Sequence, residues 1–293
     1  MKSTFSIYLK SYRNDVIRAF ELLKSIEQYN IEKIPFYISV PSEDKKIFKN
    51  TLGTGGYDLI EDEDIFYTNK SYKNIKLHEI SGNLSQQIVK SEFWRLNIST
   101  TYLCLDSDSV FLRNFSKSNF FIENEKIYTV AHNANELLQQ AKQYGKEKVI
   151  KNFLNESNNL KSYFTREGAD YDFGPSPYLW HRDVWEWLSN YLYDKELNFV
   201  DAIKLYGTED RWYGESLIKS KVIDFIPTKQ LFKVYHYKWQ YKNDLKENIS
   251  IEEIKKEYIG IIYQSNWDKR LDSRYVKKKN ILSRIVKAIN FFK

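Results

Sequence analysis

The sequence has 293 residues, of which 42% are apolar and 29% are charged, so it can bury a sizeable core as one α/β unit. Its single cysteine, Cys104, excludes a disulfide within the chain and a cysteine-based zinc site. The net charge is +6, and neither a low-complexity tract nor an internal repeat divides the sequence. We therefore expect one main domain over residues 1–270 and a basic tail over residues 271–293.

Strands and helices are expected to alternate along the first half of the chain. Apolar residues at period two predict strands, and apolar residues at helical spacing predict helices. In chain order we expect a strand at 5–9, a helix at 15–29, a strand at 35–40, a short helix from residue 42, a strand at 65–68, a helix at 85–96, and strands at 100–105 and 127–131. This order predicts an α/β fold with a mostly parallel sheet covered by helices.

The functional surface of such a sheet lies beyond the carboxyl ends of its strands. We therefore expect it at residues 11–15, 40–44 and 106–108. Farther along, residues 133–170 are polar and mixed, and they predict helices or an inserted mobile segment. Later elements are expected as strands at 222–225, 232–237 and 261–263 and as a helix at 280–292 that is apolar on one side and basic on the other.

Two acids, Asp106 and Asp108, directly follow the strongly apolar strand at 100–105. The period of a strand points both carboxylates to one side, with Ser107 opposite. Paired carboxylates suit Mn²⁺ or Mg²⁺, and such a cation would neutralise a departing diphosphate. The chain has two further Asp-x-Asp patterns, at 62–64 and 170–172, which we interpret as solvated surface and as a loop.

One helix before this strand, the chain reads Gln86-Gln-Ile-Val-Lys90. Helix, apolar strand and Asp-Ser-Asp together resemble the GT-A glycosyltransferases of bacterial surface-polysaccharide loci. More narrowly, the chain resembles a bacterial family with a Gln-Gln-x-x-Lys helix, a proline-containing acceptor loop, an acidic Tyr-Gly segment and a late Gln-Ser-Asn segment. The matching stretches are 174–177, 208–214 and 263–267, and the resemblance covers residues 4–268. It implies a GT-A fold, in which a Rossmann-like, mostly parallel sheet has helices on both sides.

The resemblance further implies a nucleotide-sugar donor, most often a UDP-sugar, and a divalent cation. The donor-binding residues that it implies are Ser11, Arg13, Asp15, Gln87, Lys90, Asp106, Ser107 and Asp108. The segment 11–15 would contact the base and ribose, and Lys90 would reach the diphosphate. Asp15 has an alternative role as the N-cap of the following helix.

A third metal ligand is expected from His236, because many GT-A enzymes bring a late histidine to the metal. The alternative is a histidine with an ordinary structural role. An inverting enzyme also needs a carboxylate base, for which we favour Asp210 over Glu209. If the enzyme retains configuration, these acids would instead bind acceptor hydroxyls, and either acid can also serve a helix N-terminus.

The acceptor is expected to be a bacterial surface glycan or glycolipid, such as a lipooligosaccharide or a capsule component. Asp172 and Ser176 are candidates for binding it. Sugar-stacking platforms or core packing are the alternatives for the tryptophans at positions 180, 212, 239 and 267. Residues 275–293 predict peripheral contact with an anionic inner membrane, or else a helix that packs on the domain or pairs with a copy of itself in a homodimer.

Several partners and compartments are disfavoured by the sequence. The N-terminal apolar run is too short for a signal peptide core, so a cytoplasmic protein is expected. No nucleic-acid-binding module is recognisable. A magnesium-dependent nucleotidyl or phosphoryl transferase is one alternative function, although residues 11–15 are not the glycine-rich loop such enzymes usually have. A non-catalytic glycan-binding protein is the other.

Overall fold

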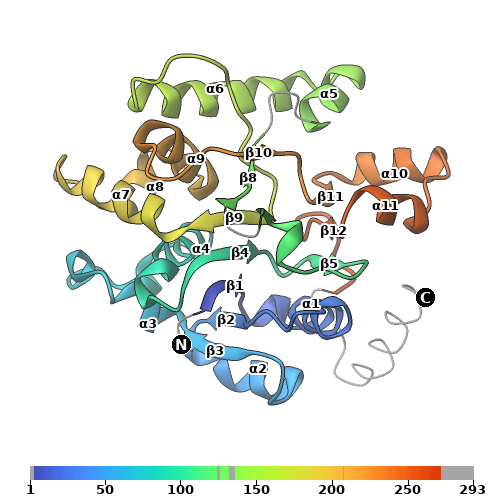
Figure 1. Ribbon diagram of the computed structural model, residues 1–293, viewed down its shortest axis with the longest axis horizontal. Helices are drawn as coiled ribbons and strands as arrows, with labels where there is room; N and C mark the ends of the chain where they lie inside the picture. The colour runs from blue at the N-terminus through green and yellow to red at the C-terminus, as the bar shows by residue number, and fades with distance from the viewer. Residues whose placement is uncertain (1–2, 124–125, 132–135, 207, 272–293) are drawn as a thin grey trace.

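A computed structural model describes residues 3–123, 126–131, 136–206 and 208–271 (Figure 1). The strands are β1 (Ser3–Lys10), β2 (Phe36–Val40), β3 (Asp58–Glu61), β4 (Ser99–Leu105), β5 (Ser109–Phe111), β6 (Phe121–Ile122), β7 (Lys126–Ile127), β8 (Thr129–Val130), β9 (Tyr178–His181), β10 (Pro227–Thr228), β11 (Phe232–Tyr235) and β12 (Gly260–Tyr263). The α-helices are α1 (Val16–Tyr29), α2 (Lys45–Leu52), α3 (Asp62–Phe66), α4 (Gly82–Glu92), α5 (Glu136–Gln143), α6 (Glu147–Tyr163), α7 (Arg182–Tyr193), α8 (Phe199–Leu205), α9 (Glu209–Ser220), α10 (Lys238–Lys246) and α11 (Ile251–Glu257). Short 3₁₀ helices are η1 (Arg13–Asp15), η2 (Ser42–Asp44), η3 (Lys70–Tyr72), η4 (Leu77–Glu79), η5 (Phe93–Leu96) and η6 (Lys117–Asn119).

The central sheet has five strands in the order β3-β2-β1-β4-β9. Strands β1 to β4 are mutually parallel where they pair, and β9 runs antiparallel to β4. The expected α/β class and mostly parallel sheet are therefore confirmed. Strands β2 and β3 follow β1 on one side of it, and β4 then pairs with β1 on its other side. The order in which strands are added therefore reverses between β1 and β4.

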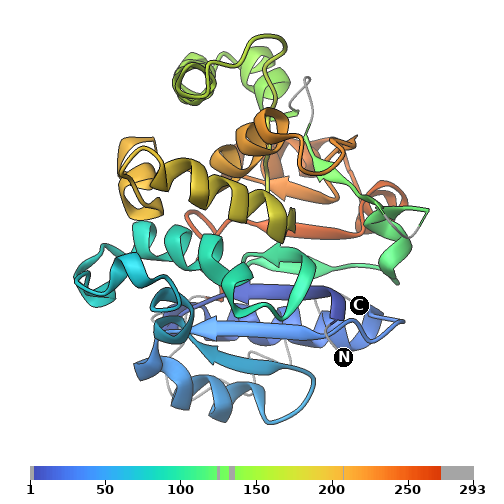
Figure 2. The same ribbon diagram turned by 60° about the vertical axis from the view of Figure 1, so that its left-hand side comes forward.

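Alternate residues of the central strands enter two separate cores. On one face, Phe5, Ile7 and Leu9 pack with α1 and α2. On the other face, Tyr8 and Cys104 pack with helices α3, α4, α7, α8 and α9. Figure 2 shows α3 and α4 in cyan to teal beside α7 and α8 in yellow, on one side of the sheet. Because period two sends neighbouring side chains to opposite faces, both faces of the sheet are covered.

A smaller sheet has three strands in the order β11-β12-β5, and its strand β5 follows shortly after β4 in the sequence. Strand β5 begins directly after Asp108 and pairs antiparallel with β12, with Ser109 opposite Ile262. This pairing carries the residues that follow β12 back to the end of β4. The late segment of the chain thus joins the loop that the sequence singled out.

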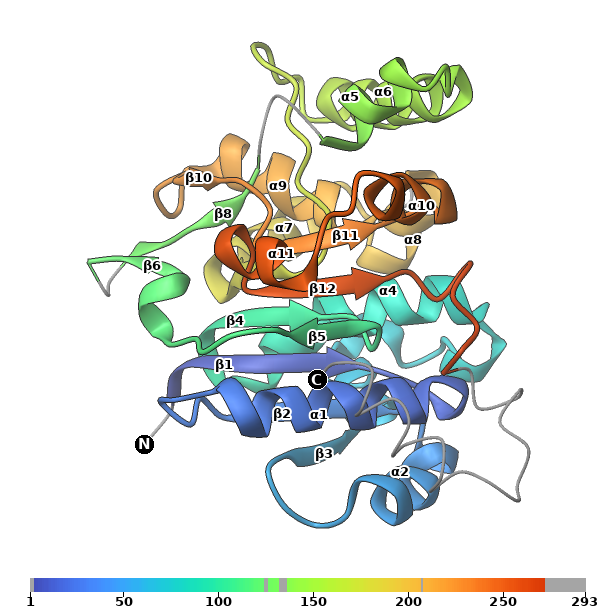
Figure 3. The same cartoon turned by 90° about the vertical axis from the view of Figure 1, so that its right-hand side faces the viewer.

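Helices α5 and α6 form an arm at the edge of the molecule opposite α2 (Figures 1 and 3). For residues 133–170 we expected either helices or an inserted mobile segment, and α5 and α6 show that this region contains helices. Within the described part of the chain, no helix combines the length and apolarity needed to cross a membrane. The expected helix at 280–292, and the tail after residue 271, lie outside the described residues.

The structure corrects three sequence-based element assignments. The strand expected at 65–68 is wrong, because β3 precedes it and residues 62–66 form α3. The pattern at 62–64 is therefore not free surface, since Asp62 is buried and pairs with Lys10 at 2.8 Å. The strand expected at 127–131 is split into β7 and β8, which pair with different strands. Residues 222–225 form no strand, and the nearest strand is β10.

Candidate functional site

The carboxyl ends of β1 and β4 lie side by side at the reversal of the sheet. The hydroxyl of Ser11, directly after β1, lies 2.8 Å from that of Ser107, two residues after β4. The amide of Ser11 also donates to the carbonyl of Ser39 on β2. Parallel α/β sheets bind ligands at such a reversal, so the fold places these loops where a ligand is expected.

A cleft of about 500 Å³ opens at this position. Its walls come from the loops after β1 and β4, from α4, from the start of α9 and from the segment after β12. The residues that line it are Lys10, Ser11, Tyr12, Asp15, Asn83, Gln86, Gln87, Lys90, Asp106, Ser107, Asp108, Tyr178, Thr208, Glu209, Asp210, Gln264 and Ser265. The structure thus brings together all the predicted donor-site, metal-site and base residues except Arg13 and His236.

The two acids after β4 have different surroundings within this cleft. Asp106 Oδ1 accepts from Lys90 Nζ at 2.5 Å and from Gln86 Nε2 at 3.4 Å. Asp108 Oδ2 accepts from the amide of Ser265 at 2.8 Å. The other oxygen of Asp108 is shielded from solvent and has no hydrogen-bond partner among the described residues.

Burial, together with the negative charge of Asp106, raises the pKa of Asp108 to about 7. A shielded carboxylate oxygen without a partner, next to a second carboxylate, is a donor set that fits a hard divalent cation. In the described ranges, no three His, Cys, Asp or Glu side chains gather closely enough to hold a metal. The fit to a cation therefore rests on the two acids after β4.

Lys90 connects the end of β4 with the start of α9. Its ammonium lies 2.5 Å from Asp106 Oδ1 and 3.2 Å from Glu209 Oε1, and its side chain is 3% exposed. Burial opposes the charge on Lys90, but the two carboxylates outweigh this effect and raise its pKa. Lys90 is thus a charged residue of the cleft wall, on the helix that the sequence predicted.

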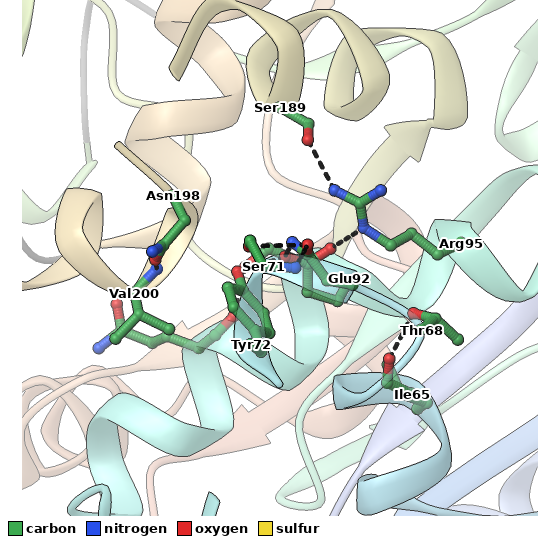
Figure 4. A network of polar contacts seen from close by, with 12 residues as sticks. Ile65, Thr68, Ser71, Tyr72, Glu92, Arg95, Ser189, Asn198 and Val200 are labelled. Atoms are coloured by element: carbon green, nitrogen blue, oxygen red, sulfur yellow. Dashed lines mark hydrogen bonds and ion pairs between the residues drawn. The ribbon is translucent and has the colours of Figure 1, made fainter. Parts of the chain in front are cut away.

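The helix that carries Lys90 is fixed by a polar network around Glu92, at the end of α4 (Figure 4). Glu92 Oε1 accepts from the hydroxyl of Tyr72 and from Asn69 Nδ2, the latter at 2.9 Å. Glu92 Oε2 accepts from Arg95, which in turn donates to Ser189 on α7 at 2.6 Å. This network joins α4 to η3 and to α7 at a position two residues after Lys90.

Both candidate bases lie in the first turn of α9 and are buried. Burial raises the pKa of Glu209, and the ammonium of Lys90 only partly offsets this shift. Burial likewise raises the pKa of Asp210, with Arg211 opposing the shift. A carboxylate with a raised pKa is better suited to accept a proton near neutral pH than an exposed one. Asp210 is the better placed of the two, because Glu209 is already paired with Lys90.

A second pocket, of about 610 Å³, adjoins the first. The two share Tyr178, Thr208, Asp210 and Gln264 as lining residues. The second pocket is further lined by Asp172, Ser176 and His236, and by residues of α6 such as Phe153 and Glu156. The candidate acceptor-binding residues therefore line a pocket that shares Asp210 with the cleft of Asp106 and Asp108 but does not include those two acids.

His236 does not line the cleft that contains Asp106 and Asp108. Burial lowers its pKa to about 4, so its imidazole is neutral near pH 7, which is the form that binds metals. In the described structure it belongs to the adjoining pocket. Its role as a third metal ligand stays a prediction.

Two residues of the loop after β1 differ in their partners. Arg13 points away from the cleft, because its guanidinium pairs with Asp44 at 2.5 Å and with Glu43 at 2.8 Å. Arg13, which we expected to bind the donor, is therefore paired with the buried carboxylate of Asp44 instead. Asp15 makes no side-chain cap at the start of α1, and its carboxylate pairs with Arg18 while lining the cleft.

Most of the tryptophans proposed as sugar platforms serve the core. Trp180 and Trp212 are 1% and 0% exposed and pack in the core behind β4. Trp267 is partly buried, and its ring lies beside that of Tyr241. Trp239 differs, because it is partly exposed and stacks on Tyr237 at the edge of the second pocket.

The sequence analysis did not predict Tyr178, Gln264 or Ser265 as site residues. For Gln264 and Ser265 a signal existed in the late Gln-Ser-Asn segment, but only the pairing of β12 with β5 shows that it reaches Asp108. Tyr178 begins a strand that the sequence did not predict, and its ring lies 5.7 Å from Lys90 Nζ. No local pattern singles it out.

Comparison with solved structures supports the fold. An active-site mutant of LgtC superposes with a TM-score of 0.52 at 11% identity, over 98% of this chain and 95% of that chain. The bifunctional glycosyltransferase WbbM gives a TM-score of 0.51 at 12% identity over 90% of this chain, which spans 46% of the length of WbbM. These similarities establish a GT-A fold shared with glycosyltransferases.

Among curated proteins, none matches this chain in sequence. A family model, in contrast, matches residues 4–277, which is nearly the whole chain. The chain therefore belongs to DUF6492, a family of unknown function.

Proposed function

We propose that this protein is a glycosyltransferase that moves a sugar from a nucleotide-sugar donor, a UDP-sugar, to a glycan or glycolipid acceptor. The observation that carries the proposal is the Asp106–Asp108 pair, with its shielded, unpartnered oxygen, in a cleft at the reversal of a GT-A sheet. The cleft has room for a ligand, since small-molecule sites typically occupy a few hundred Å³.

Asp106 and Asp108 would hold Mn²⁺ or Mg²⁺, and the cation would supply neutralisation of the diphosphate leaving group. Around them, the hydroxyls of Ser11 and Ser107 and the carboxylate of Asp15 offer polar partners for a ribose and a base. Lys90 provides a buried positive charge beside the same acids, which suits a polyanionic donor.

Asp210 is proposed as the group that accepts the proton of the acceptor hydroxyl if the anomeric centre is inverted. It lines both the donor cleft and the adjoining pocket, so it lies where the two substrates would meet. If configuration is retained, its carboxylate would instead orient acceptor hydroxyls. The adjoining pocket, with Asp172 and Ser176, is the proposed acceptor site.

The proposal is tested by calorimetry with UDP, GDP and CMP, each with and without Mn²⁺, followed by hydrolysis of the matching nucleotide sugar. We expect one nucleotide to bind in a Mn²⁺-dependent manner. Asp108→Asn should lower donor hydrolysis by about a hundredfold or more, because it removes one cation-binding charge. The variant should remain folded, since it replaces a carboxylate that already titrates near pH 7.

Asp170→Asn is the matched control, because Asp170 belongs to another Asp-x-Asp pattern and does not line the cleft. It should bind and hydrolyse the donor as the wild type does. The proposal fails if the wild type binds none of the nucleotides, or if both variants behave alike.

A further inference from the structure

A groove between the arm and the C-terminal helices lies beyond the proposed acceptor pocket. It has a volume of about 220 Å³ and is lined by residues of α5 and α10 together with Tyr144 and Glu247. Its lining residues are Gln140, Gln143, Tyr144, Gln240, Asn243, Asp244 and Glu247. We name this the α5–α10 groove.

A row of three aromatic rings connects the acceptor pocket to this groove. Tyr237 lines the acceptor pocket, and its ring stacks on that of Trp239 with an interplanar angle of 13°. The ring of Trp239 also lies 5.4 Å from the ring of Tyr144, which lines the groove, and these two rings are tilted by 57°. Tyr237 and Tyr144 are 38% and 37% exposed, so the row is open to solvent.

The chemistry of this path matches an uncharged sugar chain. Exposed aromatic faces stack on the apolar faces of sugar rings, and carboxamides both donate to and accept from hydroxyls. The groove is rich in such carboxamides and has two acids but no Lys or Arg in its lining. Asp244 is already paired with Lys233 at 3.3 Å and accepts from the hydroxyl of Tyr235. An acidic sugar would meet Glu247 without a compensating cation in the lining.

The groove is also held in shape before any ligand arrives. Gln240 Nε2 donates to Gln140 Oε1 at 2.7 Å, which ties α10 to α5. Gln240 Oε1 accepts from the backbone amide of Tyr237 at 3.0 Å, which holds the backbone at the first ring of the row beside the groove. A preformed site lowers the entropic cost of binding a flexible glycan.

We propose that the α5–α10 groove and the Tyr237–Trp239–Tyr144 row form a distal subsite for an uncharged oligosaccharide. This inference rests on the proposed function and gives it a substrate class: the acceptor is a chain of several neutral sugars. Its terminal sugar occupies the pocket beside Asp210, and the preceding sugars lie along the aromatic row.

The test uses the full chain and an array of defined uncharged oligosaccharides of one to six hexose units, with UDP and Mn²⁺ present. The array glycan that binds best is then titrated by calorimetry alongside its shorter fragments. For the wild type, affinity should rise with chain length. In Trp239→Ala the longest glycan should lose about tenfold in affinity, because a sugar-covering apolar face is removed.

Three further variants distinguish loss of the aromatic ring from misfolding. Trp239→Phe keeps an aromatic face and should retain most of the affinity. Gln143→Ala changes an exposed side chain of the groove and should also weaken only the longer glycans. Tyr67→Ala, at an exposed tyrosine at the end of α3, is the control and should change nothing. UDP binding should be the same in all variants.

The outcomes distinguish the subsite from the enzyme. The subsite proposal is overturned if glycan affinity rises equally with chain length in the wild type, Trp239→Ala and Gln143→Ala. It is also overturned if the protein binds UDP but none of the array glycans. If glycans bind in a Trp239-dependent way but no nucleotide binds, the subsite stands and the proposed transferase function fails.

Discussion

At the scale of single residues, the charge balance of the cleft depends on Lys90. One buried ammonium meets carboxylates from segments far apart in the sequence, Asp106 after β4 and Glu209 on α9. Removing one partner of a buried ion pair is costly because the other charge remains buried without compensation. Replacing Lys90 alone would leave both Asp106 and Glu209 without their cationic partner.

Lys90→Met should therefore lower the free energy of unfolding by about 3 kcal/mol in the presence of EDTA. Mn²⁺ should restore part of this loss, because a cation bound by Asp106 replaces the missing positive charge. Differential scanning fluorimetry measures both effects, and Mn²⁺ should raise the melting temperature more in Lys90→Met than in the wild type.

Lys10→Met is the control for Lys90→Met. Lys10 is buried to a similar degree but pairs with Asp62, which lies outside the proposed metal pair. The Lys10→Met variant should be less stable than the wild type, but Mn²⁺ should raise its melting temperature no more than that of the wild type. Equal Mn²⁺ responses in all three proteins would show that Lys90 does not share its carboxylate with a cation.

Individual site residues were predictable where their role follows from a strand end. Ser11, Asp106 and Asp108 directly follow or closely follow apolar strands, and the topology of an α/β sheet brings such positions together. Arg13 was not predictable, because its orientation is decided by the buried Asp44 across the loop. A side chain with several reachable partners needs tertiary structure to choose between them.

At the scale of elements, long periodic segments such as α1 and β4 were predicted correctly because their periods are unambiguous. Ile65 and Phe66 form too short an apolar run to show a period. The acids at 62–64 instead favour a helix start there, since negative side chains are stabilised at a helix N-terminus. Strand β9 escaped prediction because its four residues are followed at once by a helix.

Helix α9 carries Glu209 and Asp210, and one glycine sets how closely it packs. A Cβ at Gly214 would lie 2.1 Å from the ring of Phe173, in the segment that also carries Asp172 and Gly174. Gly214→Ala should destabilise the protein by about 2 kcal/mol, because the overpacking exceeds the gain in helix propensity. Urea unfolding measures this change.

Gly82→Ala provides the comparison for Gly214→Ala. Gly82 is the first residue of α4, and a Cβ there would meet no atom within 4 Å. This variant should be neutral or slightly more stable than the wild type. If both alanine variants unfold at the same urea concentration, the close approach of α9 to Phe173 does not limit packing.

At the scale of the whole molecule, the candidate site is assembled from nearly the entire described chain. Its lining runs from Lys10 to Ser265, with contributions from the end of β1, α4, the loop after β4, the start of β9, α9 and the segment after β12. In the first half of this set, the residues after β1 and β4 obey the strand-end rule and could be predicted. The second half arrives through the pairing of β12 with β5 and the packing of α9, which no local pattern specifies.

The same close packing buries acids that the proposed reaction does not use. Glu21, on α1, is 6% exposed, and its Oε1 has no hydrogen-bond partner among the described residues. Burial raises its pKa from 4.5 to about 7, and Lys24 only partly opposes this shift. Between these values the folded state binds more protons than the unfolded state, so this group makes stability fall as pH rises.

Histidines 181 and 236 act in the opposite direction, because burial lowers their pKa below 6.5 and favours the folded state at higher pH. A substitution at position 21 separates the effect of the Glu21 carboxyl group on stability from the effect of these histidines.

Glu21→Gln should leave stability nearly unchanged at about pH 5 and raise it by about 2 kcal/mol at about pH 8, where the wild-type carboxylate is charged. Urea unfolding at both pH values, with EDTA present, measures the difference. Glu27→Gln, at an exposed acid of the same helix, should show no such dependence on pH, and a Glu21→Gln gain of equal size at both values would contradict the assignment.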